Sequence, residues 1–405
     1  MNYTCGIDWA SEHHDVSIVN RLGMEVKGFR IEDDMDGYRE LLKVLRSFGD
    51  DIPIAIECKE HLVISFLINE GYKIYAINPK SSNRYKDRFK VSGTKTDEID
   101  AFSLANILRT DIHNHRPLAC SSKNIQKLQI LCGEYEKLLK DKNLLENQLF
   151  DVVSKYYPLV LTLFEKNSCK ILYRLIQYYP TYKKLKETSY EEFKIFLKKS
   201  HYLNPKHSER LYRRIQESDY YENNIFDEIF SHTAKALSRL LLILTEELEG
   251  IKKEMALITK NHELGKVFYS LPGSGDVMSA KLLAVMGDNK ELYRSSAEVQ
   301  AYTGIAPIVK RSGKSFRVIF RKACNRAYRD TLTWFAFCSM PYCSWARKYY
   351  DRKREEGKRH YESLRFLAFK WLRIIYELWK SGELYNEALY LNNLKRFEEK
   401  KLKIA

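Results

Sequence analysis

Three features that would direct the interpretation elsewhere are missing from the sequence. No uncharged apolar run approaches the ~18 residues that a membrane span needs, and no basic segment leading into a hydrophobic one opens the chain. The nucleotide-binding pattern G-x-x-x-x-G-K-[ST] does not occur either. We therefore expect a cytoplasmic protein that is neither inserted in a membrane nor secreted, and that uses no nucleotide as an energy source.

The cysteines form no metal-binding pattern. None of the eight belongs to a C-x-x-C pair, and the two that lie nearest in sequence, Cys338 and Cys343, have no second pair to complete a zinc site. Scattered thiols of this kind are typical of a reducing compartment. We expect them to be free and buried.

Acidic and basic side chains are distributed unevenly along the 405 residues, a length that predicts two or three domains. The chain carries 68 Lys and Arg against 53 Asp and Glu, a net charge of +15. Residues 1–100 hold 14 basic and 18 acidic side chains, whereas residues 305–375 hold 18 basic and 5 acidic ones. This division predicts work on a polyanion. Drift toward Lys codons is the alternative, which the excess of Arg in the basic region disfavours.

The first hundred residues predict a mixed α/β sheet, with three antiparallel strands followed by alternating helices and strands. The predicted strands are residues 3–9, 15–20, 24–31, 53–58 and 73–78. The predicted helices are residues 36–47, 62–69 and 97–109. Residues 12–14 and 21–23 suit hairpin turns, and Asp36 is expected to cap the first helix.

Four carboxylates stand out in this region. Asp8 falls inside the apolar first strand, where an unpaired charge is costly, and Glu57 ends the fourth strand. Asp97 and Asp100 are three residues apart and share a helix face. Carboxylates that converge on one sheet edge need a cation, and Mg²⁺ prefers such oxygen ligands. Two such ions can hold the attacking and leaving oxygens of a phosphodiester. Solvated or capping side chains are the simpler alternative, above all for Asp97.

The segments GIDWA, IAIEC, INPKSSNRYKD and KTDEIDAFSLANIL resemble the N-terminal domain of RNA-guided insertion-sequence transposases. The resemblance implies a ribonuclease-H-like fold with a RuvC-like DEDD tetrad, here Asp8, Glu57, Asp97 and Asp100, that holds Mg²⁺, with Mn²⁺ as an alternative. Members of this family usually have a Thr-Gly pair after the glutamate, where this chain has CKEH. Glu60 is therefore a second candidate, and we favour Glu57 because it directly ends the apolar strand.

Long helices are predicted from residue 125 onward. Positions 234, 237, 241, 244, 248, 251, 255 and 258 are all apolar and alternate steps of three and four, which is typical of a coiled coil. A second series between 125 and 149 fits at six of eight positions. Two core helices within their own domain are the alternative. Residues 156–230 predict a small helical segment between the two, and the resemblance implies that such a coiled coil joins two catalytic domains.

Two further stretches carry the C-terminal predictions. Gly273 and Gly275 in SLPGSGD precede a helix and predict backbone N–H groups that face a DNA phosphate, with an ordinary turn as the alternative. Residues YRSSAEVQAYTGIAPIVKRSGKSFRVIFRKACNRAYRDTLTWFAF are similar to the transposase domain of the same family, whose nucleophilic serine corresponds to Ser312. The rival serines on sequence alone are Ser295, Ser296 and Ser315.

Basic residues surround Ser312 in the sequence. A serine hydroxyl is a poor nucleophile until a neighbour or a metal helps to deprotonate it, and cations can hold the scissile phosphate and offset the charge on its oxygens. Gly313 permits close approach of the backbone. The predicted phosphate-binding side chains are Lys310, Arg311, Lys314, Arg317 and Arg321. The chain departs from the family at 322–325, where it has Lys-Ala-Cys-Asn instead of Lys-x-Gly-Asn.

We predict a RuvC-like domain at 1–118, a helical coiled-coil region with an inserted segment at 119–262 and a mostly α-helical transposase domain at 263–405. The resemblance implies a transposase that cuts and rejoins DNA through a serine–DNA intermediate. It also implies a structured guide RNA that pairs with donor and target DNA, and a homo-oligomer (dimer or tetramer) with shared active sites. The alternatives are a metal-dependent junction resolvase or nuclease that activates water, and a non-catalytic RNA-binding scaffold.

Overall fold

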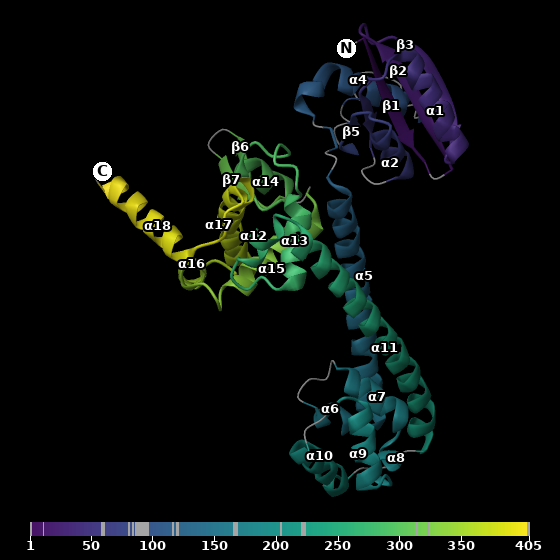
Figure 1. Cartoon of the computed structure of the whole chain (residues 1–405), viewed down its shortest axis with the longest axis vertical. Helices are drawn as coiled ribbons and strands as arrows, with labels where there is room; N and C mark the ends of the chain where they lie inside the picture. The colour runs from purple at the N-terminus through teal and green to yellow at the C-terminus, as the bar shows by residue number, and fades with distance from the viewer. Residues whose placement is uncertain are drawn as a thin grey trace. The chain divides into compact units, whose positions relative to one another are not determined.

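The chain folds into two compact units, residues 1–120 and 121–405 (Figure 1). The computed structural model describes residues 2–10, 12–57, 61–79, 82, 85, 97–115, 117–118, 121–164, 169–202, 205–219, 224–312, 315–321 and 324–402. Within these ranges, no helix is both long enough and apolar enough to cross a membrane.

The N-terminal unit is built on a five-stranded mixed sheet. Its strands are β1 (Tyr3–Trp9), β2 (His13–Asn20), β3 (Glu25–Glu32), β4 (Ile54–Ile56) and β5 (Ile74–Ala76), in the spatial order β3-β2-β1-β4-β5. β1, β2 and β3 pair antiparallel, whereas β4 and β5 continue the sheet parallel to β1. β1 is therefore the central strand, and it joins the antiparallel and parallel halves of the sheet.

Helices cover both faces of this sheet. α1 (Met35–Phe48) and α2 (Leu62–Asn69) form one apolar core with Ile7 and Ile18. α4 (Asp97–Asp111), followed by the short η1 (Ile112–Asn114), packs on the opposite face, where the Thr4 hydroxyl donates to the Ala105 carbonyl at 3.0 Å. Because side chains alternate along a strand, consecutive residues of β1 face different helices.

The predicted order of strands and helices is confirmed for this unit, but two details are wrong. His13 and His14 belong to β2 rather than to the preceding turn, because they remain paired with the neighbouring strands. The cap of α1 is Asp34, whose carboxylate accepts a first-turn N–H at 2.8 Å. Asp36 instead lies inside the first turn, where it pairs with a surface arginine.

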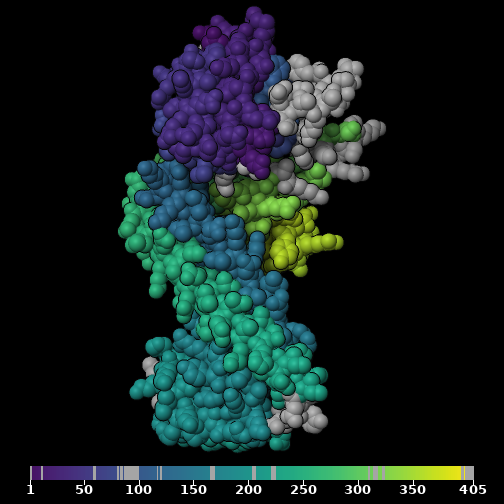
Figure 2. Space-filling model, turned by 90° about the vertical axis from the view of Figure 1, so that its right-hand side faces the viewer, coloured from purple at the N-terminus to yellow at the C-terminus, as the bar shows by residue number. Residues whose placement is uncertain are grey.

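Two long helices, α5 (Lys123–Tyr156) and α11 (Asn224–Asn261), run antiparallel and side by side in the second unit (Figure 1). Ile125 and Leu128 share a core with Met255 at one end of the pair, and Leu149 shares a core with Leu241 at the other. In Figure 2, the atoms of α11 cross those of α5 on the surface of this unit. All eight predicted heptad positions of α11 are buried or half-buried, as a helix–helix seam requires.

The two polar residues in the predicted seam of α5 bind each other. Lys142 donates to the Glu146 carboxylate, which also accepts a hydrogen bond from the Tyr173 hydroxyl. Glu146 is 8% exposed and Lys142 is 13% exposed, so both charges are largely removed from water. A buried charge requires such partners, which explains how a polar pair fits into an otherwise apolar seam.

Short helices fill the segment between α5 and α11 and enclose a tyrosine-rich and leucine-rich core. They are α6 (Val160–Leu163), α7 (Lys170–Tyr178), α8 (Tyr182–Lys186), α9 (Tyr190–Lys199) and α10 (Pro205–Glu217). Ser189 and Glu192 form a reciprocal capping box that defines the start of α9. The predicted small helical insertion is thus present, at the far end of the α5–α11 pair in Figure 1.

The C-terminal part of this unit is mostly helical, as predicted. Its elements are α12 (Gly265–Tyr269), α13 (Asp276–Met286), α14 (Ser296–Tyr302), β6 (Ile308–Ser312), β7 (Ser315–Ile319), α15 (Arg326–Ser339), α16 (Ser344–Glu355), α17 (His360–Ser381) and α18 (Glu387–Leu402). Trp371 and Trp379 of α17 are fully buried, and their indole N–H groups donate to the Ser339 hydroxyl and the Gly287 carbonyl. The β6–β7 hairpin departs from the predicted helical character of this region.

Candidate functional site

Asp8 and Glu57 occupy matching positions at the ends of two parallel strands. β1 and β4 are paired up to Ile7 and Ile56, and the two carboxylates are the next residues on each strand. Residues that are paired across strands point to the same face. Asp8 and Glu57 therefore both point to the face that α4 covers. Both side chains are half-buried. Asp8 is only half-buried because β1 ends one residue later, at Trp9.

A glycine in β1 lets α4 approach this face closely. A Cβ atom on Gly6 would lie 2.1 Å from the carbonyl oxygen of Ala101, a distance at which backbone atoms would have to move. Only a residue without a side chain therefore fits between the central strand and the helix. Gly6 thus fixes the spacing between the strand that carries Asp8 and the helix that begins at Asp97.

The same contacts set the register of α4 along β1. Thr4 of β1 contacts Ala105 of α4, and Gly6, two residues later on β1, contacts Ala101, four residues earlier on α4. Strand and helix rises of ~3.3 and ~1.5 Å per residue make these steps nearly equal in length. The same spacing, continued by two residues on β1 and four residues on α4, places Asp8 next to the first turn of α4.

The first turn of α4 carries the other two predicted ligands. Asp100 is buried, with 8% of its surface exposed. The backbone of Asp97 begins α4, but its side chain lies outside the described residues, as does the alternative ligand Glu60. Asp8, Glu57 and this turn meet on one face of the sheet and offer only carboxylate oxygens. This donor set fits Mg²⁺.

A further carboxylate lies beside Asp8. Asp15 is opposite Asp8 in the β1–β2 register, and it is buried. Arg30 of β3 donates two hydrogen bonds to Asp15, at 2.9 and 3.0 Å. Such two-point pairs satisfy a carboxylate fully. Asp15 is therefore neutralised within the protein and is a weaker ligand candidate than Asp8.

A second ligand cluster was missed by the sequence analysis. In the described part of the chain, one group of three potential metal ligands has all its ligand atoms within 4.8 Å of one another, and it consists of His14, Asp33 and His61. Asp8, Glu57 and Asp100 do not meet this criterion as a group. The three cluster residues are far apart in sequence and follow no known ligand spacing.

Ser312 is the last residue of β6 and lies near the tip of a two-stranded hairpin. It pairs with Ser315 of β7, and the connecting residues 313–314 lie outside the described residues. Lys310 pairs with Arg317, two residues further along each strand. The side chain of Ser312 is exposed.

The rival serines differ in what they do. The Ser295 hydroxyl accepts a hydrogen bond from the Glu298 N–H at 3.4 Å and caps α14. Ser296 follows it as the first residue of the same helix. Ser315 shares the hairpin with Ser312, and its side chain lies outside the described residues. The cap gives Ser295 a structural role, whereas Ser312 and Ser315 remain comparable in position.

Arginine side chains gather where β7 leads into α15. Phe320 lies under two guanidinium groups, that of Arg365 at 3.8 Å and that of Arg329 at 4.8 Å from the ring centroid. Arg311 is exposed and Arg321 is half-buried. The side chains of Lys310, Lys314 and Arg317 lie outside the described residues. This surface is strongly positive and suits a nucleic-acid backbone.

Gly273 has a packing role. Its φ is +75°, and a Cβ atom there would lie 2.2 Å from the Cys338 carbonyl oxygen at the end of α15. Gly275 precedes α13, and a Cβ atom added there would meet nothing within 4 Å. The turn therefore needs glycine at 273 for packing within the unit. Its predicted contact with DNA stays a prediction.

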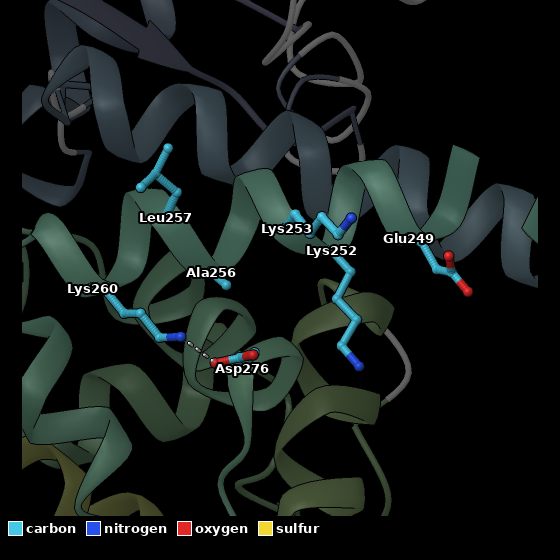
Figure 3. A pocket seen from close by; sticks show the side chains of 7 residues that line it. All are labelled: Glu249, Lys252, Lys253, Ala256, Leu257, Lys260 and Asp276. Atoms are coloured by element: carbon cyan, nitrogen blue, oxygen red, sulfur yellow. Dashed lines mark ion pairs between the residues drawn. The ribbon is translucent and has the colours of Figure 1, made fainter. Parts of the chain in front are cut away.

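A shallow hollow of about 420 Å³ lies between α11 and the start of α13 (Figure 3). Three lysines line it, and Lys260 points to Asp276 at 3.3 Å. The Tyr269 hydroxyl donates to Asp276 at 2.9 Å, and this bond together with Lys260 lowers the pKa of the Asp276 carboxyl. An ionised carboxylate thus already occupies the positive end of α13, which disfavours a second anion there.

Exposed aromatic rings form a row between α15 and α17. Trp334 stacks on Phe337 at 5.1 Å with an interplanar angle of 22°, and Phe337 contacts His360, which contacts Tyr361. Trp334 and Tyr361 are 57% and 73% exposed. Exposed aromatic rings in a basic region of the chain are typical of surfaces on which nucleobases stack. The sequence analysis missed this row because its rings come from two helices.

A mixed sheet with carboxylates on one face, followed by a basic helical region, defines an enzyme that acts on nucleic acid. Comparison with known proteins agrees. A family described as transposase, the DEDD type of IS110, matches residues 5–158, and the transposase IS116/IS110/IS902 family matches residues 265–351. The chain is 31% identical over 394 residues, 95% of both chains, to a Streptomyces coelicolor protein named as the mini-circle transposase for IS117.

More distant relatives extend the match. An IS900 insertion-element protein of Mycobacterium paratuberculosis is 21% identical over 95% of this chain and 97% of its own length. An IS110 insertion-element protein of Streptomyces coelicolor is 23% identical over 73% of each chain. The protein belongs to the IS110/IS116/IS902 family of insertion-sequence transposases, which are DNA-processing enzymes and, as DEDD proteins, are expected to depend on a divalent metal.

Proposed function

We propose that this transposase cuts and rejoins DNA through a covalent bond to Ser312, with Mg²⁺ held by Asp8, Glu57, Asp97 and Asp100. The N-terminal unit is then a ribonuclease-H-like, RuvC-like domain, and its strand order supports that assignment. The observation that carries the proposal is the register that brings Asp8, Glu57 and the first turn of α4 to one face. Mg²⁺ supplies charge stabilisation to the phosphate oxygens when it is bound.

The residues of the chain divide the work. The carboxylates hold the cation, while the arginines around Phe320 and the hairpin lysines hold the scissile phosphate. Ser312 Oγ bonds to phosphorus, the bond from phosphorus to one deoxyribose oxygen breaks, and the hydroxyl proton ends on that oxygen. A DNA hydroxyl later attacks the phosphoserine, and Ser312 leaves with a proton. The number of phosphodiester bonds is conserved, so rejoining needs no nucleotide.

Sequence selection is assigned to a guide RNA in this proposal. The resemblance to RNA-guided members of the family motivates it. The positive surface near Phe320 and the exposed aromatic row support nucleic-acid binding by the same unit. Such a surface binds backbone and unstacked bases without reading a long sequence, which leaves recognition of donor and target DNA to base pairing.

We also propose that the working unit is a homo-oligomer with composite active sites. α11 carries a second apolar row on its outward side, in addition to the seam that faces α5. The residues of this row are Ile225, Ile229, Leu240, Ile243 and Leu257, each 49–67% exposed. We assign these side chains to the contact between protomers, because the core of such a contact needs apolar side chains that are exposed in the single chain. Ser312 of one protomer is then placed next to the tetrad of another.

A covalent adduct tests the nucleophile. The full-length protein is incubated with labelled DNA that carries the ends of its element, with its RNA and Mg²⁺, and protein–DNA adducts that survive denaturant are measured. We expect an adduct with the wild type and with Ser295→Ala, and none with Ser312→Ala. Cleavage without an adduct would identify water as the nucleophile, as in a resolvase. Loss of the adduct in Ser315→Ala alone would move the assignment to Ser315.

A further inference from the structure

His14, Asp33 and His61 come together on the face of the sheet opposite the tetrad. His14 of β2 pairs with Trp9 of β1, so it lies on the face of Ile7, which α1 and α2 cover. Asp33 directly follows β3, and His61 is the N-cap of α2. Asp8 and Glu57 belong to the other face, toward α4. The same end of the sheet therefore carries two separate groups of potential ligands.

The geometry of this cluster is compact. His14 Nε2 lies 3.0 Å from one oxygen of the Asp33 carboxylate, and His61 Nε2 lies 3.3 Å from the other. One ligand atom from each of the three side chains lies within 4.8 Å of the other two. His14 is fully buried, and the side chains of Asp33 and His61 are 19% and 16% exposed. Three ligands thus converge at a point that solvent reaches from one side.

We propose that His14, Asp33 and His61 form a second metal site, for a borderline divalent cation of the Zn²⁺ class. Two imidazoles and one carboxylate are a common set for Zn²⁺ and related transition metals. The tetrad contains only oxygen donors, which favour Mg²⁺. The two sites would therefore select different metals on opposite faces of one sheet.

The surroundings of the cluster support ligation. The Tyr38 hydroxyl donates to the Asp33 carboxylate, and its ring stacks on that of His14. Hydrogen bonds from an outer partner orient ligating carboxylates in metal sites. Trp9 packs edge-on against His61 at 5.3 Å and covers it from outside.

Two existing hydrogen bonds must yield when a metal binds. One joins His14 Nε2 to the Asp33 carboxylate at 3.0 Å, and the metal would take its place between these two ligands. His61 Nδ1 accepts from the Val63 N–H at 3.4 Å, so Nε2 carries the proton in the neutral ring. Ligation through Nε2 requires that proton to move to Nδ1. A hydrogen bond of 3.4 Å is long and weak, and its loss costs little. The bound metal would compensate for this loss, because its three ligands join the starts of β2 and α2 to the end of β3.

Metal titration of the full-length protein tests the proposal. The chelator-treated protein is titrated with Zn²⁺ by calorimetry in excess Mg²⁺, which occupies the tetrad. We expect one equivalent to bind tightly and to raise the melting temperature. Binding should weaken about 100-fold or more in His61→Gln and Asp33→Asn, and by ~10–100-fold in Tyr38→Phe, which removes only the outer hydrogen bond.

Controls separate this site from the tetrad and from chance binding. His13→Gln changes the neighbouring histidine, which lies outside the cluster, and should leave Zn²⁺ affinity unchanged. Asp8→Asn should also leave it unchanged, even though the proposed function predicts that this variant cannot cut DNA. Co²⁺ provides a readout that does not depend on any variant, because nitrogen ligation of cobalt gives visible absorption. A wild-type protein without Zn²⁺ affinity and without a cobalt spectrum, or equal binding by His61→Gln and Asp33→Asn, would overturn the site.

Discussion

The fold holds the tetrad and Ser312 in opposite ways. Asp8 and Glu57 follow paired strands of a sheet that is covered on both faces, and Asp100 is buried on a helix that packs directly against Gly6. Ser312 stands exposed on a hairpin with five residues in each strand. Two-stranded hairpins are marginally stable by themselves. We infer that the packed core fixes the geometry of the metal ligands. The position of Ser312, in contrast, becomes fixed only when the hairpin binds nucleic acid.

The largest expected effect comes from removing a ligand of the tetrad. Asp8→Asn should reduce strand cleavage by about 10³-fold or more, because metal ions contribute several kcal/mol of charge stabilisation. Binding of DNA and RNA should remain close to that of the wild type. Cleavage is measured on labelled DNA in Mg²⁺ buffer and binding by mobility shift.

Asp36→Asn is the matched control for this variant. Asp36 belongs to the same unit, but it is exposed and pairs with Arg39 on the surface of α1. The change should leave cleavage within about twofold of the wild type, since surface substitutions rarely exceed ~0.5 kcal/mol. Full recombination by Asp8→Asn would refute the assignment of Asp8 as a ligand.

Complementation tests whether the two regions meet between protomers. Ser312→Ala and Asp8→Asn proteins are each expected to be inactive alone. In a mixture of equal amounts, half of randomly formed dimers are mixed, and each mixed dimer has one intact composite site. About a quarter of the wild-type sites should therefore be recovered. Recombination is measured after the proteins are mixed and allowed to exchange.

The mixed oligomers must be detected independently, for example by differently tagged subunits that copurify. If such oligomers form and activity does not return, Ser312 and the tetrad belong to one chain. That result would leave the chemistry intact and remove only the sharing of sites. The exposed apolar row of α11 would then need another explanation.

Substitutions in the sheet and in the hairpin should also differ in their effect on the free energy of unfolding. In Gly6→Ala, the new methyl group meets the Ala101 carbonyl oxygen, so α4 must move away from β1. We expect destabilisation of about 3 kcal/mol, at the upper end of typical overpacking costs. Ser312→Ala lies on an exposed strand end and should change the free energy of unfolding by less than ~0.5 kcal/mol. Chemical denaturation followed by circular dichroism measures both.

The sequence predicts the first unit well because each of its signals is local. The apolar segment around Asp8 and the apolar run IAI before Glu57 are enough to predict β1 and β4 and to place Glu57 at the end of its strand. The seam of α11 follows in the same way from its spacing of three and four. The polar residues in the seam of α5 could not be explained from the sequence, because the Tyr173 hydroxyl that donates to Glu146 lies 27 residues away.

Contacts between distant residues account for what was missed. His14, Asp33 and His61 come from three elements, and the sequence analysis assigned His14 to a turn. The packing of Gly273 against Cys338 joins residues 65 positions apart, so the turn was interpreted through its glycines alone. The β6–β7 hairpin is different, because a local signal existed: IVKRS and SFRVI flank Gly-Lys.

The smallest expected effect concerns the salt dependence of DNA binding. If Arg321 and Arg365 contact phosphates, the slope of log affinity against log salt should fall by about 0.9 for each contact that is removed on duplex DNA. Arg321→Gln and Arg365→Gln are compared with Arg39→Gln, whose guanidinium pairs with Asp36 in the N-terminal unit. The control should keep the wild-type slope. An unchanged slope in both C-terminal variants would mean that neither arginine contacts a phosphate, and the proposed reaction would then depend on the basic residues of the hairpin to hold the scissile phosphate.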